Sequence, residues 1–251
     1  MSQAEVHGPL HGQQALVTGG STGIGAAICD ELLRLGARVI SVALDAREGA
    51  THQRMQQRVV DLADPAQVRA FAAGLGETPI DILVNNAGVV VTRPLEEVTE
   101  EDFDRLMNLH VRTAILLAQA VVPGMKLRRS GRIVNIASRA IVGMAGRTTY
   151  AASKAALVSI TRTWALELGP FGITVNAVSP GPIATPMLER DLPAGSDRAA
   201  ALAASIPLRR LGQAEDVAQA VSFFASPASG WITGQNLFVC GGASLAASLV
   251  L

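Results

Sequence analysis

Strand-like and helix-like segments alternate along almost the whole chain, and no other feature of the sequence constrains the fold as strongly. The strand-like segments are short and rich in Val, Ile and Leu, which is typical of strands buried on both faces of a sheet. Segments of helix length, with apolar residues at helical spacing, separate them, so the sequence predicts an α/β fold with a parallel sheet covered on both faces. The predicted strands are residues 15–18, 39–44, 58–61, 80–84, 131–137, 173–178 and 237–239. The predicted helices are residues 24–35, 65–74, 99–129 with a break near Pro123, 149–168 and 214–225.

No stretch of linker composition interrupts this pattern, so the 251 residues are predicted to form a single domain, residues 1–251. Residues 1–12 precede the first predicted strand and are expected to form a flexible tail. Residues 180–207 are the least regular stretch, with Pro, Gly and Ala scattered through it. A long irregular segment in a compact domain is usually a functional loop, so we interpret this one as a lid over the substrate.

Composition excludes several classes of protein. Hydrophobic residues make up 49% of the chain and charged residues 17%, which rules out disorder. The 21 basic residues balance the 21 acidic ones, and a nucleic-acid-binding protein would carry a basic excess. The N-terminus lacks the pattern of a signal peptide, and no apolar stretch reaches the roughly 20 residues of a membrane helix. We therefore expect a cytoplasmic protein with no membrane or nucleic-acid partner; the sequence predicts no metal site.

A glycine-rich turn, TGGSTGIG at residues 18–25, follows the first predicted strand and opens a predicted helix. Gly19, Gly23 and Gly25 would let the backbone turn tightly and approach a pyrophosphate, which the N-terminus of the helix would bind. The alternative is an ordinary strand-to-helix turn with a helix-packing glycine. The position after the first strand favours dinucleotide binding, and with it a Rossmann-type, doubly wound sheet of seven strands, mainly parallel.

Tyr150 and Lys154 lie four residues apart in a strong helical pattern and therefore share one helix face. A phenol normally titrates near pH 10, and a nearby ammonium lowers that pKa, so the pair suits proton transfer to or from an alcohol oxygen. Most such pairs are simply surface contacts. Here Tyr150 is the only tyrosine of the chain, and Ser138 lies at the carboxyl end of the fifth predicted strand, where open α/β sheets bind ligands.

Six blocks in the same order resemble the short-chain dehydrogenase/reductase family over essentially the whole chain. They are TGGSTGIG at 18–25, NNAG at 85–88, Asn108 with the triad Ser138, Tyr150 and Lys154, SPGPIATPM at 179–187, LGQAEDVA at 211–218 and ITGQNLFVCGG at 232–242. One position departs from the pattern, because the family usually has Asp where this chain has Cys240. That position is normally structural, so we expect no loss of activity.

The resemblance implies roles for these residues. Tyr150 would be the general acid or base, Lys154 would hold the nicotinamide ribose and lower the Tyr150 pKa, and Ser138 would position the substrate oxygen. Asn108 would hold a water in a proton relay to Lys154; alternatively it marks a helix kink, because Asn is a poor helix former. The implied cofactor-binding residues are Gly19, Ser21, Thr22, Gly23, Ile24, Gly25, Asp45, Asp61, Leu62, Asn86, Ala87, Gly88, Tyr150, Lys154, Pro180, Gly181, Ile183 and Thr185.

The choice between NAD and NADP depends on the end of the second predicted strand. Members that use NAD usually carry an acidic residue at about position 43, and members that use NADP a basic one at 44 or just before Gly23. This chain has Ala43, Leu44 and Thr22 instead. Asp45 would still reach the ribose and repel a 2′-phosphate, although Arg47 would be able to swing back and accept one. With no cation at 22 or 44, the sequence favours NAD(H) over NADP(H).

The predicted function is an NAD(P)-dependent oxidoreductase that interconverts a small secondary alcohol and a ketone. The nearest alternative is a 3-oxoacyl thioester reductase acting on acyl carrier protein, which shares the whole pattern. A different class, a non-catalytic cofactor-binding regulator, usually loses the Tyr or the Lys, and both are present here. The resemblance also implies a homotetramer packed through the two long helices.

Arg139 and Arg147 lie between Ser138 and Tyr150, beside the expected substrate pocket. Their guanidinium groups would be able to bind a carboxylate or a phosphate in a fork geometry. We favour the alternative, a salt bridge at the surface or at a subunit interface.

Overall fold

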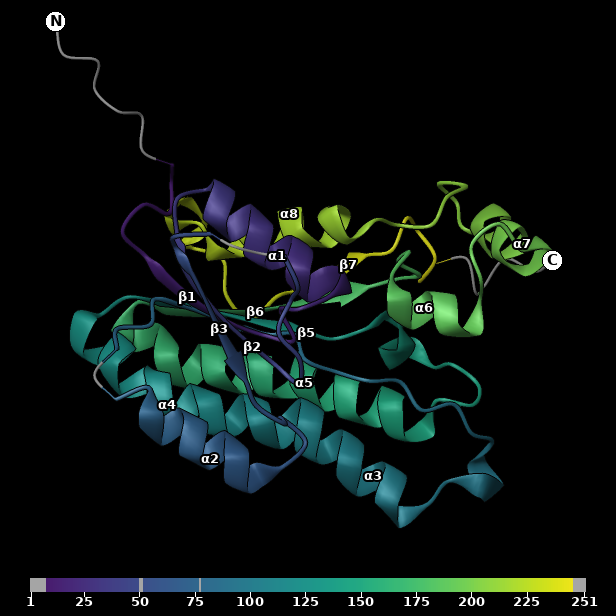
Figure 1. The fold of residues 1–251 in the computed structure, drawn as a ribbon, viewed down its shortest axis with the longest axis horizontal. Coiled ribbons are helices and arrows are strands. Elements are labelled where there is room, and N and C mark those ends of the chain that lie inside the picture. Colours follow the sequence, from purple (N-terminus) through teal and green to yellow (C-terminus); the bar gives the residue numbers. More distant parts are fainter. Residues whose placement is uncertain (1–7, 50–51, 77, 246–251) are drawn as a thin grey trace, which may run out of the picture.

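The computed structural model describes residues 8–49, 52–76 and 78–245, and their strands form one seven-stranded sheet (Figure 1). The strand order is β3-β2-β1-β4-β5-β6-β7, and every neighbouring pair is parallel. The strands are β1 (Gln14–Thr18), β2 (Arg38–Ala43), β3 (Met55–Val59), β4 (Ile82–Asn85), β5 (Gly131–Ile136), β6 (Ile173–Pro180) and β7 (Asn236–Val239). The predicted doubly wound α/β fold is confirmed.

Helices cover both faces of this sheet (Figure 1). On one face lie α1 (Gly23–Arg34) and α8 (Ala214–Ala225), and on the other lie α2 (Pro65–Gly74), α4 (Thr113–Arg128) and α5 (Thr148–Leu168). Each layer buries its own apolar core against the sheet. Leu32 of α1 and Val221 of α8 are fully buried on the first face, and Leu117 of α4 on the second. Aliphatic side chains therefore hold both layers, as the scarcity of aromatic residues requires.

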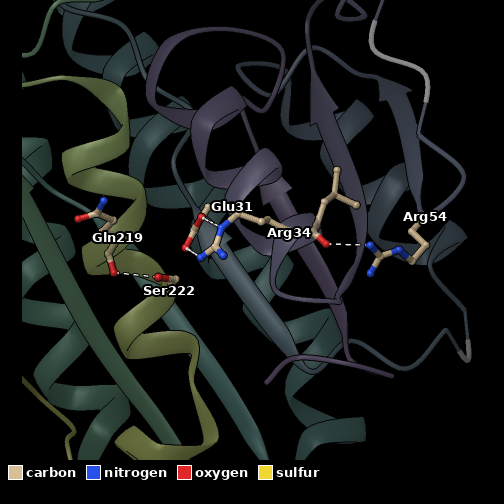
Figure 2. Close-up of polar contacts among 6 residues, drawn as sticks. Glu31, Arg34, Arg54, Gln219 and Ser222 are labelled. Carbon is tan, nitrogen blue, oxygen red and sulfur yellow. Dashed lines mark hydrogen bonds and ion pairs between the residues drawn. The ribbon is translucent and has the colours of Figure 1, made fainter. Parts of the chain in front are cut away.

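Polar contacts fix the end of α1 at the outer surface (Figure 2). Arg34 pairs with Glu31 one turn earlier, at 2.7 Å between Nε and Oε2. The Nη2 of Arg54, in the loop before β3, donates to the carbonyl oxygen of Leu33 at 2.9 Å. That carbonyl lies in the last turn of α1 and also accepts from the Gly36 N–H at 3.0 Å. The contact joins the end of α1 to the edge strand β3.

The predicted helix 99–129 consists of three pieces. α3 (Glu100–Leu106) has Thr99 as its N-cap residue, whose Oγ1 accepts from the Asp102 N–H at 3.1 Å. A π-helical segment, Met107–Arg112, follows and leads directly into α4. The predicted break near Pro123 is wrong, because α4 continues through that residue. The change in geometry lies eleven or more residues earlier instead.

The continuous stretch Glu100–Arg128 is long and apolar enough to cross a membrane, judged by length and composition alone. This finding differs from the expectation that no apolar stretch of the chain is long enough for a membrane helix. However, 44% of its most apolar window is buried inside the protein, and a core helix of a soluble protein passes the same test. One such helix is weak evidence for a membrane span.

Two further expectations about irregular segments need correction. Residues 180–207 contain α6 (Pro186–Asp191) and α7 (Asp197–Ser205), so the predicted lid is largely helical. Residues 8–12 of the predicted tail pack against the domain: Leu10 is fully buried, and its N–H donates to the Leu35 carbonyl at 2.9 Å. The rest of that tail, residues 1–7, lies outside the described residues.

Candidate active site

The glycine-rich turn between β1 and α1 lies where the strand order reverses, since β1 has β2 on one side and β4 on the other. Open α/β sheets bind ligands in the crevice outside the carboxyl ends of the strands at this point. Gly19 and Gly23 have φ angles of +67° and +52°, in the left-handed region that favours glycine. A Cβ atom at Gly25 would lie 2.0 Å from the Gly19 carbonyl oxygen. Glycine is therefore required for this turn to pack as tightly as it does.

The first turn of α1 presents unpaired N–H groups. Its N-cap residue is Thr22, and no side-chain hydrogen bond caps the helix. The first N–H groups of an α-helix have no partner within the helix and form an anion site. Ser21 and Ile24 flank this point, at the end of the turn and in the first turn of α1.

The loop after β4 supports the glycine-rich turn. Thr18 Oγ1 accepts from the backbone N–H groups of Asn86, at 2.8 Å, and Ala87, at 2.9 Å. The side-chain amide of Asn86 donates to the carbonyl oxygens of Thr18, at 2.9 Å, and Gly19, at 3.2 Å. The Asn86 side chain and the backbone N–H groups of Asn86 and Ala87 are therefore all used to hold this loop against the glycine-rich turn.

Gly88 brings this loop against α5. A Cβ atom at Gly88 would lie 2.9 Å from His110 Nε2 and 3.3 Å from Lys154 Nζ. Any side chain here would push both groups away. The close approach of His110 and Lys154 thus explains why the NNAG block ends in glycine.

Tyr150 and Ser138 meet at the carboxyl end of β5. Ser138 caps a 3₁₀ turn, Arg139–Val142, its Oγ accepting from the Ala140 N–H at 3.1 Å, and it acts on the pKa of the Tyr150 phenol. Burial raises the pKa of Tyr150, while the hydrogen bond from Ser138 and the positive charge of Arg147 oppose that rise. The groups that shift this pKa do not include Lys154.

Lys154 is buried one turn along α5 from Tyr150. Its Nζ donates to the Ile136 carbonyl oxygen at 2.8 Å and lies 6.0 Å from the centroid of the Tyr150 ring. Burial lowers the pKa of Lys154 to about 7. An amine with that pKa gains and loses a proton readily at neutral pH, which suits a proton relay.

Asn108 lies in the π-helical segment, beside the catalytic helix. Its backbone carbonyl oxygen accepts from the Thr113 hydroxyl at 3.0 Å, and the same hydroxyl lies 2.7 Å from the Leu62 carbonyl oxygen. The widened turn therefore coincides with Asn108, in agreement with the prediction of an irregular helix there. π-Helical turns within α-helices are frequent at functional sites.

His110 is a residue of this site that the sequence analysis missed. It is 2% exposed, and its ring lies edge-on to that of Tyr150, with 5.9 Å between centroids. Its Nε2 accepts from the Val89 N–H at 3.1 Å, so in the neutral ring Nδ1 carries the proton and donates to Ser153 Oγ at 2.8 Å. Ser153 Oγ in turn donates to the Tyr150 carbonyl oxygen at 2.9 Å. No motif marks this histidine; only its place two residues after Asn108 would have drawn attention to it.

The segment after β6 closes over the glycine-rich turn. The side chain of Thr185 is the nearest group to Gly23, at 3.3 Å from a Cβ atom placed there. Ile183 is buried and bridges to Gly212, whose carbonyl oxygen accepts from the Ala184 N–H at 2.8 Å. Pro180 ends β6, and the Gly181 N–H donates to the Val239 carbonyl oxygen at 2.9 Å. The start of residues 180–207 is thus anchored to the glycine-rich turn, to Gly212 and to β7.

The end of β2 carries the groups that would discriminate between cofactors. Asp45 is exposed, and Leu62 is buried. Asp61 accepts from the Ala63 N–H at 2.8 Å, which fixes the turn after β3. Arg47 pairs with Asp30 of α1, at 2.8 Å between Nη1 and Oδ1, and its N–H donates to Gln57 Oε1 at 2.6 Å. Arg47 is therefore held on both its backbone and its side chain.

A salt bridge of Arg139 or Arg147 across a subunit interface stays a prediction, whereas one within the described part of this chain is not formed. Within residues 8–49, 52–76 and 78–245, none of the ion pairs includes either residue. Arg139 lies in the 3₁₀ turn after Ser138 and is half-buried. Arg147 is the N-cap residue of α5, and its Nη1 is buried without a hydrogen-bond partner.

These residues fit a dinucleotide. Gly19, Gly23 and Gly25 form a cradle that Cβ atoms would fill, and the uncapped first turn of α1 offers N–H donors for a pyrophosphate. Tyr150 and Lys154 lie beyond it, at the carboxyl ends of β4 and β5. The fold and the site together define an NAD(P)-dependent oxidoreductase of the doubly wound α/β class.

Comparisons with known proteins agree. The family model described as Enoyl-(Acyl carrier protein) reductase matches residues 19–244. The chain is 41% identical to the 3-oxoacyl-[acyl-carrier-protein] reductase FabG of Pseudomonas aeruginosa, over 93% of this chain and 98% of that protein. It is 38% identical to (2S)-[(R)-hydroxy(phenyl)methyl]succinyl-CoA dehydrogenase subunit BbsD of Thauera aromatica, over 94% and 98%. The structure of a blue fluorescent protein from a metagenomic library in complex with NADPH matches with a TM-score of 0.84 at 40% identity, over 94% and 99%. The chain belongs to the short-chain dehydrogenase/reductase family.

Proposed function

We propose that this enzyme interconverts a secondary alcohol and a ketone, with Tyr150 as the general acid or base and NAD(H) as the cofactor. The observation that carries the proposal is the position of Lys154, which is buried one helical turn from Tyr150. Its Nζ lies 6.0 Å from the centre of the Tyr150 ring and 2.8 Å from the Ile136 carbonyl oxygen, at the end of the strand that Ser138 follows. This geometry supports a proton donor and a further hydroxyl at the same end of β5.

The roles follow from these positions. In the reductive direction Tyr150 donates its proton to the ketone oxygen, and Ser138 orients that oxygen by a second hydrogen bond. Lys154 stabilises the phenolate that remains and holds the nicotinamide ribose, and Asn108 holds a water that leads to Lys154. The bound nicotinamide supplies or accepts the hydride. The α1 N-terminus, the loop 86–88 and the segment 180–185 hold the cofactor in place.

Replacing Tyr150 by Phe tests the assignment of the acid. The change removes the proton and keeps the ring, so turnover should fall by roughly 10²–10⁴-fold or more. Steady-state kinetics with a panel of secondary alcohols and ketones would measure this. Binding of NADH, followed by its fluorescence, should survive the substitution and serves as the control. Near-full activity of Tyr150→Phe would show that another group moves the proton.

The preference for NAD(H) rests on the end of β2. Asp45 is exposed there and would repel a 2′-phosphate, while Arg47 is already held by Asp30 and Gln57. The kcat/KM measured with NAD should exceed the kcat/KM measured with NADP for the same substrate. Asp45→Ala should reduce the ratio of these two values. Glu48→Ala, at a neighbouring exposed carboxylate, is the control. Wild-type preference for NADP would overturn the assignment; the relative in complex with NADPH makes this a real alternative.

A 3-oxoacyl thioester reductase is the second candidate function. It is favoured by the 41% identity to the Pseudomonas aeruginosa reductase of that name, of which the chain covers 98%. The reaction at Tyr150 would be the same, because a 3-oxoacyl group also presents a ketone. Turnover of a 3-oxoacyl thioester far above that of simple ketones would support it.

We also infer that the enzyme is cytoplasmic.

A homotetramer is the proposed assembly. Two separate apolar faces are exposed on the described part of the chain: Leu127 and Leu166 project from α4 and α5, and Phe223 and Trp231 lie in and after α8. A closed tetramer of two-fold symmetries uses two different self-complementary interfaces, which these two faces would supply.

A further inference from the structure

One cationic side chain beside the proposed acid is left without a partner. Arg147 caps α5 one turn before Tyr150, and its Nη1 is buried. No hydrogen-bond acceptor among the described residues reaches that nitrogen. The carboxylate of Asp102 is paired with Arg93 instead. Arg147 therefore presents an unused donor, and its neighbourhood offers no protein group to complete it.

The backbone around Arg147 is fixed, so this donor is held in place. The Gly146 carbonyl oxygen accepts from the Arg93 N–H at 3.0 Å, and Arg93 and Arg147 form a β-bridge. The Arg147 N–H donates to the Met144 carbonyl oxygen at 3.2 Å, and the Arg147 carbonyl oxygen accepts from the Ala151 N–H at 2.7 Å. These bonds set the start of α5 and the origin of the Arg147 side chain.

A buried guanidinium nitrogen without an acceptor is costly, and such groups are normally completed by a partner. Arg147 is the N-cap residue of α5 and Tyr150 lies in the first turn of that helix, so both side chains start from the same end of α5. The positive charge of Arg147 acts on the Tyr150 phenol, which places the two groups within electrostatic reach. A partner for Arg147 would therefore lie close to the substrate oxygen that Tyr150 serves.

We propose that Arg147 binds a carboxylate of the substrate, so that the enzyme acts on secondary hydroxy acids and the corresponding keto acids. This inference rests on the proposed function and adds a substrate class to it. A guanidinium matches a carboxylate in charge and in its planar, two-pronged geometry. Bound in this way, the carboxylate would fix which face of the reacting carbon the substrate presents.

The test compares acids with neutral analogues of the same shape. The probes are 2-, 3- and 4-hydroxypentanoate, each paired with its primary amide, and the enzymes are wild type, Arg147→Met, Arg147→Lys and Arg162→Met. Arg162 is an exposed arginine further along α5 and is the matched control. The ratio of kcat/KM for acid and amide removes any effect of Arg147 on Tyr150, because that effect is common to both probes.

We expect the wild-type enzyme to prefer at least one acid over its amide. Arg147→Met should lower kcat/KM for that acid by roughly 10- to 100-fold, as for the loss of a hydrogen bond to a charged group, and should change the amide far less. Arg147→Lys should recover part of the loss, and Arg162→Met should behave as wild type. An acid-to-amide ratio that Arg147→Met leaves unchanged would overturn the inference.

Two further measurements separate this inference from its alternatives. If every alcohol fails as a substrate, the proposed function fails. The role of Arg147 can still be tested by calorimetry, which measures the binding of 4-oxopentanoate and of 4-oxopentanamide to the protein saturated with NAD⁺. Tighter binding of the acid that is lost in Arg147→Met would support the carboxylate site, and equal binding by both proteins would refute it. If Arg147→Met lowers the particle mass in light scattering and leaves the acid-to-amide ratio unchanged, Arg147 pairs across a subunit interface and the inference is wrong.

Discussion

A single buried imidazole joins three separate segments of the active site. His110 accepts a hydrogen bond from Val89 in the loop after β4 and donates one to Ser153 in α5, while itself lying in the π-helical segment. Burial and the positive charge of Lys154 hold the pKa of His110 well below its usual value. The ring is therefore neutral in the folded protein, which is the state that the two hydrogen bonds require.

This histidine should make the protein sensitive to acid. Below about pH 6.5 an unfolded histidine binds a proton while folded His110 does not, so unfolding becomes easier as the pH falls, by up to about 1.4 kcal/mol per pH unit. Above that pH both states are neutral and this contribution to the pH dependence vanishes. Denaturant unfolding at a series of pH values should show that the free energy of unfolding falls with pH below about pH 6.5, and His110→Asn should reduce this dependence. His52→Asn, at an exposed histidine, should leave it unchanged.

At the scale of elements, a chain of buried side-chain hydrogen bonds joins β4, β5 and α5. Asn85 Nδ2 donates to Asn135 Oδ1, and Asn135 Nδ2 donates to Thr161 Oγ1, each at 2.8 Å. Thr161 Oγ1 donates in turn to the Leu157 carbonyl oxygen at 2.7 Å. Asn85, the first asparagine of the NNAG block, thus helps to hold α5 on the sheet. Its place in a cofactor motif did not suggest this role.

Thr161→Val should weaken this attachment. The substitution keeps the volume and removes the acceptor for Asn135 Nδ2, so the free energy of unfolding should fall by about 1–3 kcal/mol. Chemical denaturation would measure the loss. Thr163→Val, at an exposed threonine of the same helix, should change it by less than about 0.5 kcal/mol. Equal effects of the two substitutions would mean that the buried hydrogen bonds add nothing to the free energy of unfolding beyond the difference in helix propensity between Thr and Val.

For the molecule as a whole, the sequence predicted the sheet well because six of its strands carry apolar residues with a visible period or run. β3 was placed three residues late, since Met55–Val59 reads MQQRV and an edge strand of this kind has little apolar signal. The helices α6 and α7 were missed because Pro193 and Gly195 separate two short pieces. The motifs located the site, whereas the bonds of His110 and the unpaired Arg147 depend on contacts between distant segments.

The proposed tetramer leads to a test at this scale. Trp231 is 99% exposed and is the most prominent apolar side chain beyond α8. Light scattering of the wild type should give a particle of about four times 26.1 kDa, and Trp231→Asp should halve that mass by disrupting one of two interfaces. A wild-type particle of 26.1 kDa would contradict the assembly. An unchanged mass for Trp231→Asp would exclude this face from it.

The π-helical segment Met107–Arg112 has a consequence for how the chain can change in length. Removing one residue there would restore ordinary α-helical bonding, and the wide turn that holds Asn108 and His110 would be lost. Asn108 and His110 would then no longer face α5 while Leu117 still faced the sheet. Surface loops tolerate insertions and deletions, whereas this helix does not. Among natural or laboratory variants of this enzyme, gaps should therefore gather in the loops and be absent between Glu100 and Arg128.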